Sequence, residues 1–369
     1  MRASDGNYYP GLDHVRALAA FLVFGWHFTH GFNGFPAPFG PGVLPVLAPF
    51  NEGHCGVALF MCLSGYLFAK ILDGKRVAWH RFYWNRILRL APLLIVVCAI
   101  RGALVSQNQP TELTNYANSL LRGFVEPTWP NGAWSITVEI HFYLLLWIII
   151  PLMRRWPPSL FGFLALGLGT RLLIYAAGGD VAHYAYWTII GRIDQFVLGI
   201  AAWECRDILK GRHVWIGIVG VAYFSFYQWF VSIGGYYATQ GNQPVWIAVP
   251  TLDAAFFSFL VAYYDNTFAF RRVWYWRLLE LIGTASYSIY LLHTFVVFHM
   301  AVVVEKYLPG MATWEVAEAA SLAAFAIIVP ISWLSYRLVE MPFLGFRIKY
   351  TLEQRAQSGI ARGSSLCAR

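Results

Sequence analysis

Charged residues are scarce in this sequence. Asp, Glu, Lys and Arg make up 12% of the 369 residues, whereas about 25% is typical of a soluble domain. Hydrophobic residues make up 58%. A chain with so little charge cannot cover its core with a well-hydrated surface, which excludes an ordinary soluble enzyme. We therefore expect an integral membrane protein.

The sequence also lacks the usual signs of a metal centre or a disulfide scaffold. There is no P-loop, no GxSxG and no HExxH. We expect no metal site and no disulfide framework, because cysteines that serve as small apolar packing residues need no particular spacing. Neither CxxC pairs nor metal-ligand spacings occur among the five cysteines, which are Cys55, Cys62, Cys98, Cys205 and Cys367.

Long apolar runs are what the sequence has instead. Alternating ten-residue segments typical of an outer-membrane barrel do not recur, whereas apolar runs of about twenty residues do. The runs predict an all-α, polytopic membrane helix bundle with about ten transmembrane helices. The expected spans are 12–31, 53–72, 87–105, 134–153, 159–177, 186–205, 213–233, 244–264, 283–303 and 314–337.

Basic residues predict the orientation of these spans. They cluster in alternate loops, such as the segment from Lys70 to Arg89, whereas the opposite loops hold only Arg122 and Lys306. By the positive-inside rule both termini are cytoplasmic. The net charge of +8 is then explained by short cytoplasmic loops that meet lipid headgroups, without a nucleic-acid partner. We expect residues 1–350 to form one transmembrane domain and residues 351–369 a polar, disordered tail.

The first span carries an arginine and a histidine on one face. Arg16 and His27 are eleven residues apart, which places them about 20° apart around the helix and roughly 16 Å apart along it. Ionisable groups within a span usually face a cavity or a partner, so the pair suggests a shared pocket. The alternative is that Arg16 snorkels to the interface and His27 caps a neighbouring carbonyl.

Two motifs, one at the cytoplasmic end of the third span and one near the middle of the second, allow two interpretations each. Arg86 and Arg89 lie one turn apart, so their guanidinium groups either clamp a phosphate or anchor the span at the membrane surface. The Ser64-Gly65 pair in the second span either lets two helices approach closely or opens the backbone toward a ligand.

Glu139 in the fourth span needs a partner, because a carboxylate is costly inside a membrane. His27 lies at a similar depth, which allows a His–Glu pair, while His141 points elsewhere on the helix. Arg192 and Asp194 are two residues apart, so they face different ways and each needs its own partner. Further candidate pocket residues are Ser64, Trp134, Tyr290 and His293, although a histidine such as His293 is more often a hydrogen-bonded core residue. Glu340, among basic residues at the cytoplasmic face, is expected to form a salt bridge.

Six ordered motifs together resemble one family. They are LDHVRALA followed by His27, LFMCLSGYLF, RILRLAP, WSITVEIHFY, SYSIYLLH and RLVEMPF. These motifs span about Leu12 to Phe343 and are similar to those of the integral-membrane acyltransferase 3 family, which O-acylates sugars and other hydroxyl compounds. The departures are His14, Ala91 and Ile140-His141, which affect fine geometry rather than membership.

The resemblance implies roles for particular residues. His27 matches the family's essential histidine, Arg16 its paired arginine, Glu139 its fourth-span acid, and Arg86 with Arg89 the arginines that hold the donor. The donor implied is acyl-CoA, usually acetyl-CoA, a co-substrate rather than a bound cofactor. Many relatives carry a fused external hydrolase-like domain, and without one the membrane helices would perform the whole reaction.

The residues then allow a mechanism and a rival. His27 would act as the general base on a hydroxyl of a sugar, glycolipid or macrolide-like acceptor, with Glu139 orienting it, while an acyl-imidazole intermediate is the competing route. Aromatic external loops, including residues 32–52 and Trp129, are candidates for holding the acceptor. The protein is expected in a bacterial cytoplasmic membrane. The rival class is a transporter or lipid-binding channel, which also buries charges along a path.

Overall fold

The chain folds almost entirely into helices. The computed structural model describes residues 8–30, 47–271, 273–307 and 314–353. A helix satisfies its own backbone hydrogen bonds, which a membrane requires, and the predicted all-α bundle is confirmed. The long helices are α1 (Pro10–His30), α3 (Gly56–Leu72), α4 (Trp79–Asn108), α6 (Trp134–Arg155), α7 (Ser159–Ala176), α9 (Ile189–Glu204), α11 (His213–Ser232), α13 (Val245–Thr267), α15 (Ser286–Tyr307) and α16 (Trp314–Ser335).

Short elements connect these helices. Most lie in the loops, and η4 is a stretch of π-helix that continues α16. They are α2 (Ala48–Asn51), η2 (Gly53–Cys55), β1 (Lys75–Val77), η3 (Pro110–Glu112), α5 (Leu113–Arg122), α8 (Val181–Trp187), α10 (Arg206–Leu209), α12 (Gly235–Ala238), α14 (Trp274–Thr284), η4 (Tyr336–Glu340), α17 (Met341–Leu344) and β2 (Thr351–Glu353).

The number of membrane crossings is bounded by helix length and composition. Within the described ranges, seven helical segments are long and apolar enough to cross a membrane, or eight if α14 and α15 count as one bent span. α1, with Asp13 and Arg16 in its first turns, and α9, with 16 residues, are outside this set. Each of the ten expected segments contains a helix, and the count of ten spans stays a prediction.

Two expected spans are interrupted. The span 186–205 was expected to be continuous, but Thr188 ends α8 and caps α9 by accepting a hydrogen bond from Gly191 N at 3.2 Å. The span 283–303 was placed too late, because α14 begins at Trp274 and α14 and α15 meet at an angle of 71°. Apolar run length alone does not reveal either break.

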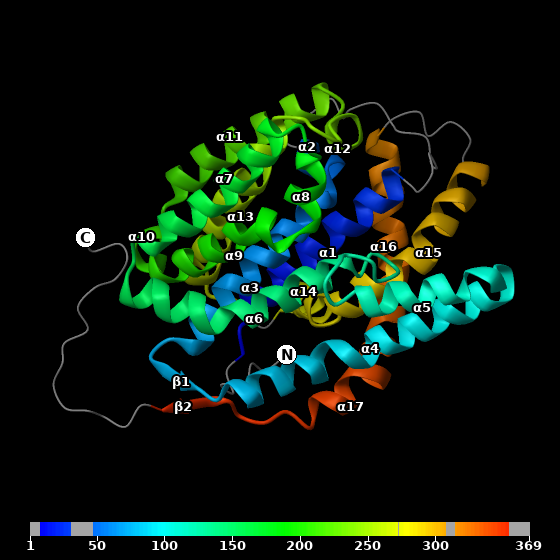
Figure 1. Ribbon diagram of the computed structural model, residues 1–369, viewed down its shortest axis with the longest axis horizontal. Helices are drawn as coiled ribbons and strands as arrows, with labels where there is room; N and C mark the ends of the chain where they lie inside the picture. The colour runs from blue at the N-terminus through cyan, green and yellow to red at the C-terminus, as the bar shows by residue number, and fades with distance from the viewer. Residues whose placement is uncertain (1–7, 31–46, 272, 308–313, 354–369) are drawn as a thin grey trace.

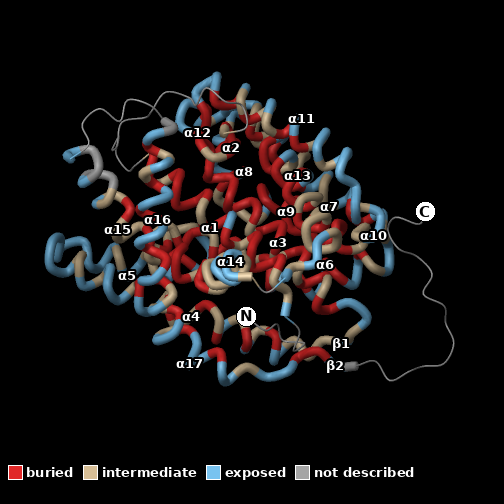
Figure 2. Tube along the Cα trace, turned by 180° about the vertical axis from the view of Figure 1, so that it is seen from behind, coloured by how far each residue is buried: buried red, intermediate tan, exposed pale blue. Residues whose placement is uncertain are grey.

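α1, α3 and α9 occupy the centre of the bundle. Figure 2 shows their traces mostly in the colour of buried residues, while α5 and the outer faces of α7 and α11 are exposed. In the most apolar part of each helical segment, 78% of the residues are buried for α3, but only 22% for α7 and 22% for α11. α3 therefore faces protein on nearly all sides, whereas α7 and α11 present apolar side chains outward, as lipid-facing helices do.

Glycines set the close contact between α3 and α9. A Cβ at Gly65 would collide with the carbonyl oxygen of Phe196, and a Cβ at Gly199 with that of Cys62. The two glycines thus let the backbones touch, as small residues do between membrane helices. This confirms the close-approach interpretation of the Ser64-Gly65 pair.

A third glycine lies beside the break between α14 and α15. A Cβ at Gly283 would collide with the backbone of Asp13 in α1, so α14 packs directly on the first turns of α1. The chain then turns at Ala285, and Ser286 begins α15. The break brings backbone from residues 283–286 toward the interior of the bundle.

The last described segment crosses one end of the bundle. This end carries Lys70, Arg81 and Arg154 and is here called the basic end. Figure 1 shows α17 and β2 running beside α4 and β1 at one edge of the molecule. β2 pairs antiparallel with β1. Residues 351–353 of the expected tail are therefore a strand rather than disordered, because β1 offers them hydrogen-bonding partners, and residues 354–369 lie outside the described part.

The contact between α3 and α9 yields a stability prediction. Gly199→Ala should lower the melting temperature in detergent, because the new methyl group overpacks the helix contact at a cost of about 1–3 kcal/mol. Gly217→Ala is the control, since a Cβ at Gly217 has nothing within 4 Å. Ala has a higher helix propensity than Gly at both positions. If Gly199→Ala, like Gly217→Ala, melted at or above the wild-type temperature, the close contact of α3 with α9 would be contradicted.

Candidate active site

One cavity of about 180 Å³ runs into the bundle from the basic end. It has room for on the order of ten waters, since a water needs about 10–15 Å³ of such space. Its walls come from α1, α3, α4, α6 and the α14–α15 break. The polar or charged residues among those that line it are Tyr9, Asp13, Arg16, Ser64, Arg86, Arg89, Ser135, Glu139, Tyr143, Thr284, Ser286, Tyr287, Tyr290 and Arg347.

Two of the lining arginines are paired with carboxylates. Arg16 Nη1 lies 2.5 Å from Asp13 Oδ1, one turn earlier on α1. Arg89 Nη1 lies 2.5 Å from Glu340 Oε2, and the Glu340 carboxylate is fully buried. The salt bridge expected for Glu340 is confirmed, and its partner is the second arginine of the RILRLAP motif.

Arg86 is held differently. Its guanidinium carbon lies 5.2 Å from the ring centre of Phe68 and 5.7 Å from that of Tyr143, distances typical of cation–π contacts. Its Nε atom is buried and has no hydrogen-bond partner in the described part of the chain. Arg86 is thus a half-buried cation among aromatic rings, and its Nε–H can still donate a hydrogen bond.

Glu139 belongs to the cavity wall and not to His27. It accepts hydrogen bonds from the hydroxyl of Tyr143, one turn further along α6, and from Ser64 Oγ at 3.5 Å. The hydrogen bonds of Glu139 among the described residues lead to these two groups. The similar depth of Glu139 and His27 allowed a pair between them. That pairing is wrong for this structure, because the carboxylate is turned toward α3 and the arginines.

His27 contacts a second histidine instead. Its Nδ1 lies 2.8 Å from the carbonyl oxygen of Val23 and 3.4 Å from His293 Nε2. His293 Nδ1 lies 2.6 Å from the carbonyl oxygen of Tyr290. A carbonyl only accepts, so each Nδ1 carries the proton in the neutral pair. His293 Nε2 then accepts from the His27 Nδ1–H, whereas His27 Nε2 keeps its lone pair. His27 Nε2 is therefore available to accept a proton.

His27 lies outside the cavity and is connected to it through His293 and α15. It is partly exposed, whereas His293 is buried, and neither lines the cavity. Tyr290, one turn before His293, does line it, and its hydroxyl donates to the Gly132 carbonyl and accepts from Ser135 Oγ at 2.6 Å. Tyr290 and Ser135 thus close the cavity on the side of the two histidines.

The other predicted pocket residues lie outside the cavity. Asp194 pairs with Arg171 at 2.8 Å, and both side chains are fully buried. Arg192 lies 4.4 Å from the ring centre of Tyr186 and 5.4 Å from that of Trp134. The expectation that Arg192 and Asp194 find separate partners is confirmed, but the partners join helices rather than line the cavity.

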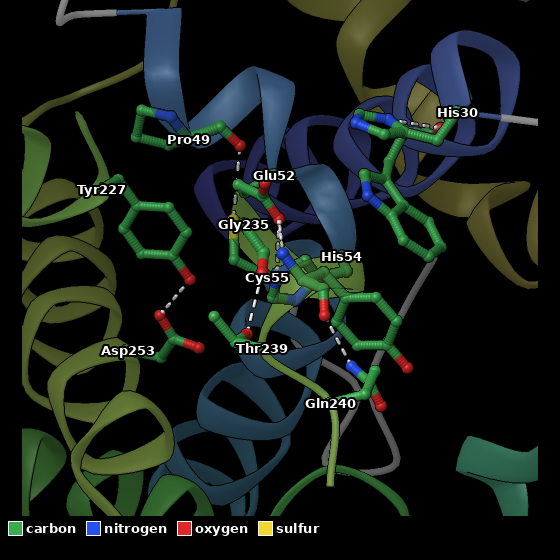
Figure 3. A network of polar contacts seen from close by, with 12 residues as sticks. His30, Pro49, Glu52, His54, Cys55, Tyr227, Gly235, Thr239, Gln240 and Asp253 are labelled. Atoms are coloured by element: carbon green, nitrogen blue, oxygen red, sulfur yellow. Dashed lines mark hydrogen bonds and ion pairs between the residues drawn. The ribbon is translucent and has the colours of Figure 1, made fainter. Parts of the chain in front are cut away.

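A further polar network supports the end of α1 that carries His27. Figure 3 shows Glu52 beside His54, with the Glu52 carboxylate 3.1 Å from His54 Nε2. Glu52 also accepts a hydrogen bond from the backbone N of Tyr236 at 3.1 Å, and the ring of Tyr236 packs on Trp26, next to His27. The network fixes α2 and α12 against α1.

Sequence reasoning missed Tyr143 and Arg347. Tyr143 follows Glu139 by four residues, so helical spacing could have revealed it. Arg347 follows the last helix, and only the fold brings it to Arg86. No group of three or more candidate metal ligands occurs within the described ranges. Residues 31–46, most of the external loop considered for acceptor binding, lie outside them.

Comparisons with known proteins point to one kind of activity. The family model described as "Acyltransferase domain" matches residues 9–337. BcsY of Komagataeibacter xylinus, whose name describes a membrane-bound transacylase, is 26% identical over 80% of this chain and 77% of its own length. The peptidoglycan O-acetyltransferase OatA of Listeria monocytogenes is 23% identical over 91% of this chain. OatA of Staphylococcus aureus is 25% identical over 78% of it.

The matched regions leave part of the relatives uncovered. The alignments span 56% of the Listeria protein and 50% of the Staphylococcus protein. No solved structure matches the chain.

The ion pair between Arg171 and Asp194 should be structural. Arg171→Leu should cost about 3–5 kcal/mol, because it leaves a buried carboxylate uncompensated. The double variant Arg171→Leu with Asp194→Leu should melt closer to the wild type than the single variant does. If the double variant lost as much melting temperature as the two single variants together, this pairing would be contradicted.

Proposed function

Because the chain belongs to this family of membrane acyltransferases, we propose that it moves an acyl group, in the simplest case acetyl, from acyl-CoA to a hydroxyl group of a carbohydrate or glycosylated acceptor. The observation that carries the proposal is the cavity that begins at the basic end and is lined by Arg16, Arg86 and Arg89. Guanidinium groups bind phosphates strongly and geometrically. The coenzyme A phosphates would lie at this mouth.

The pantetheine arm would occupy the part of the cavity that lies away from the arginines. Ser64, Ser135 and Tyr290 provide hydroxyl groups along a largely apolar wall. A thin, amide-bearing chain fits such a lining, because apolar surface covers the methylene groups and a few hydroxyls meet the amides. Glu139 would act here as a positioning residue, since it holds the Tyr143 ring beside Arg86.

The two histidines supply the chemistry at the far end of this path. His27 Nε2 would take the proton of the acceptor hydroxyl while the oxygen attacks the thioester carbonyl carbon. The carbon–sulfur bond then breaks, and the thiolate takes the proton from the His27 imidazolium, so that free coenzyme A leaves. His293 would be a positioning residue that fixes the tautomer of His27. Acylation of His27 itself is the alternative route.

The approach to His27 requires Tyr290 to give way. Its hydroxyl is tied to Gly132 and Ser135, so these bonds must open before a thioester can pass from the cavity to the imidazole. Such gating by a loop contact is common in enzymes that exclude water until substrate binds. The loop involved is the one that follows Trp129 and precedes α6.

The acceptor is proposed by analogy with the relatives. OatA of Listeria monocytogenes is named for peptidoglycan, which suggests a cell-envelope carbohydrate on the side of the membrane opposite the basic end. With the basic end in the cytoplasm, the donor and the acceptor would meet at His27 from opposite sides of a bacterial cytoplasmic membrane.

The broken helix α14–α15 favours a second candidate, a transporter. Interrupted helices whose backbone lines a midmembrane cavity are typical of secondary transporters. Incubation of the purified protein with radiolabelled acetyl-CoA and candidate acceptors separates the two functions. An acyltransferase releases free coenzyme A and labels the acceptor, and a transporter does neither.

Removal of the proposed base gives the first catalytic prediction. His27→Gln should lower the turnover number on the order of a thousandfold, within the range for loss of a general base. His293→Phe should lower it less and should leave the KM for acetyl-CoA unchanged. His30→Gln, one turn further along α1, is the control. Turnover of His27→Gln equal to that of the control would remove His27 from the chemistry.

Removal of the proposed phosphate ligand should act on donor binding. Arg86→Gln should raise the KM for acetyl-CoA about tenfold or more, the expected effect of one lost charge-assisted hydrogen bond. Arg155→Gln is the matched control, because Arg155 is an exposed arginine at the same end of the bundle. An unchanged KM for Arg86→Gln would contradict donor binding by Arg86 and favour the interpretation of Arg86 as a membrane anchor.

A further inference from the structure

The segment that follows the last helix reaches the proposed donor site. Residues 345–353, here called the C-terminal strap, leave α17 and cross the basic end beside α4 until β2 pairs with β1 (Figure 1). Arg347 in this segment is one of the residues that line the cavity. The strap therefore contributes a side chain to the same space as Arg86 and Arg89.

Hydrogen bonds fix the strap in register with α4. Asn85 Nδ2 donates to the Ile348 carbonyl oxygen at 2.7 Å, and Ile348 N donates to Asn85 Oδ1 at 3.0 Å. The backbone N of Ala78 donates to the Tyr350 carbonyl oxygen at 2.9 Å. Asn85 is fully buried and directly precedes Arg86. The side chains of Arg86 and Arg347 are thus held at the same mouth from two segments.

Cationic charge concentrates where the strap meets α4. Burial, and then the like charges of Arg86 and Arg89, lower the pKa of the Arg347 guanidinium. Glu340 balances Arg89, Arg347 Nε donates to the Leu344 carbonyl oxygen at 3.1 Å, and Glu139 is turned to Tyr143 and Ser64. Like charges held together in a partly buried place repel one another, and an anion placed among them removes that repulsion.

A buried hydroxyl lies behind the wall of the same cavity, since Tyr350 is not itself one of the lining residues. Tyr350 is 0% exposed, and its hydroxyl has no hydrogen-bond partner in the described part of the chain. The Tyr350 ring centre lies 5.4 Å from that of Phe82, and the Phe82 ring centre lies 5.6 Å from the guanidinium carbon of Arg86. A buried hydroxyl normally has a partner, and a phosphate oxygen between the two guanidinium groups would supply one.

We propose that the C-terminal strap is part of the donor site, where Arg347, Arg86 and the Tyr350 hydroxyl together bind a phosphate group of the nucleotide end of the donor. The inference rests on the proposed function. It assigns donor binding to residues that lie outside the six sequence motifs. It makes the last described segment of the chain a determinant of donor specificity, which selects a phosphorylated thioester over a bare one.

The experiment compares two donors and four proteins in phosphatidylcholine vesicles. Wild type, Arg347→Gln, Tyr350→Phe and Lys349→Gln are assayed with acetyl-CoA and with S-acetylpantetheine, which has the same thioester but no phosphate. Lys349 is the matched control, because it is an exposed basic residue of the same strap. Equilibrium binding of radiolabelled coenzyme A is measured in parallel.

Arg347→Gln should raise the KM for acetyl-CoA, and the Kd for coenzyme A, about tenfold or more. Tyr350→Phe should raise both by a smaller factor. The KM for S-acetylpantetheine should be the same in all four proteins, and Lys349→Gln should behave as wild type with both donors. A fifth protein, Arg347→Lys, assayed in the same way, should keep part of the affinity, since it retains the charge but not the planar fork.

Three results would overturn the inference. The first is an unchanged Kd for coenzyme A in both Arg347→Gln and Tyr350→Phe. The second is an equal rise in KM for both donors, which would indicate a general structural defect. The third is an effect of Arg347→Gln that appears only when phosphatidylglycerol is added to the vesicles, which would identify the phosphate as a lipid headgroup. A wild type that releases no coenzyme A from either donor would instead contradict the proposed function.

Discussion

The balance of buried guanidinium charge organises the functional half of this protein. Four arginines line one cavity in a bundle with few charged residues. Each charge inside a low-dielectric bundle must meet an opposite charge, an aromatic face or water. Asp13 and Glu340 meet two of the arginines, and aromatic rings surround Arg86. Arg347 Nε donates to the Leu344 carbonyl oxygen. The donor site proposed above adds the anion of a phosphate to this set of charges.

Close backbone contacts create the space in which those charges lie. Gly65 and Gly199 bring α3 and α9 together, and Gly283 brings α14 onto α1. The break that follows Gly283 places Gly283, Thr284 and Ser286 in the wall of the cavity, together with residues of α1, α4 and α6. The same break orients Tyr290 toward the loop before α6 and His293 toward His27. Packing on one side of the bundle is therefore linked to the placement of reactive groups on the other.

The sequence predicted the elements better than the pairs. Apolar runs revealed where helices lie, and the spacing of Arg86 and Arg89 was enough to place both at one mouth. Their partners are distant in sequence, so no local pattern could assign Glu340 to Arg89 or Arg347 to the site. The prediction for Glu139 failed because similar depth in two spans does not determine rotation about their axes. His293 was a candidate, but only the contact of its Nε2 atom with His27 Nδ1 in the structure identifies it as the partner of that residue.

The account depends most directly on the path of the donor. A structure of the protein bound to a non-reactive thioether analogue of acetyl-CoA tests it in one measurement. The expected result is phosphate density among the arginines of the basic end. The acyl carbon should lie beside His27 Nε2, within about 3.5 Å of the place where the oxygen of a reacting acceptor would bind. An analogue bound elsewhere, or one whose acyl group stays on the cavity side of an unmoved Tyr290, would contradict the account.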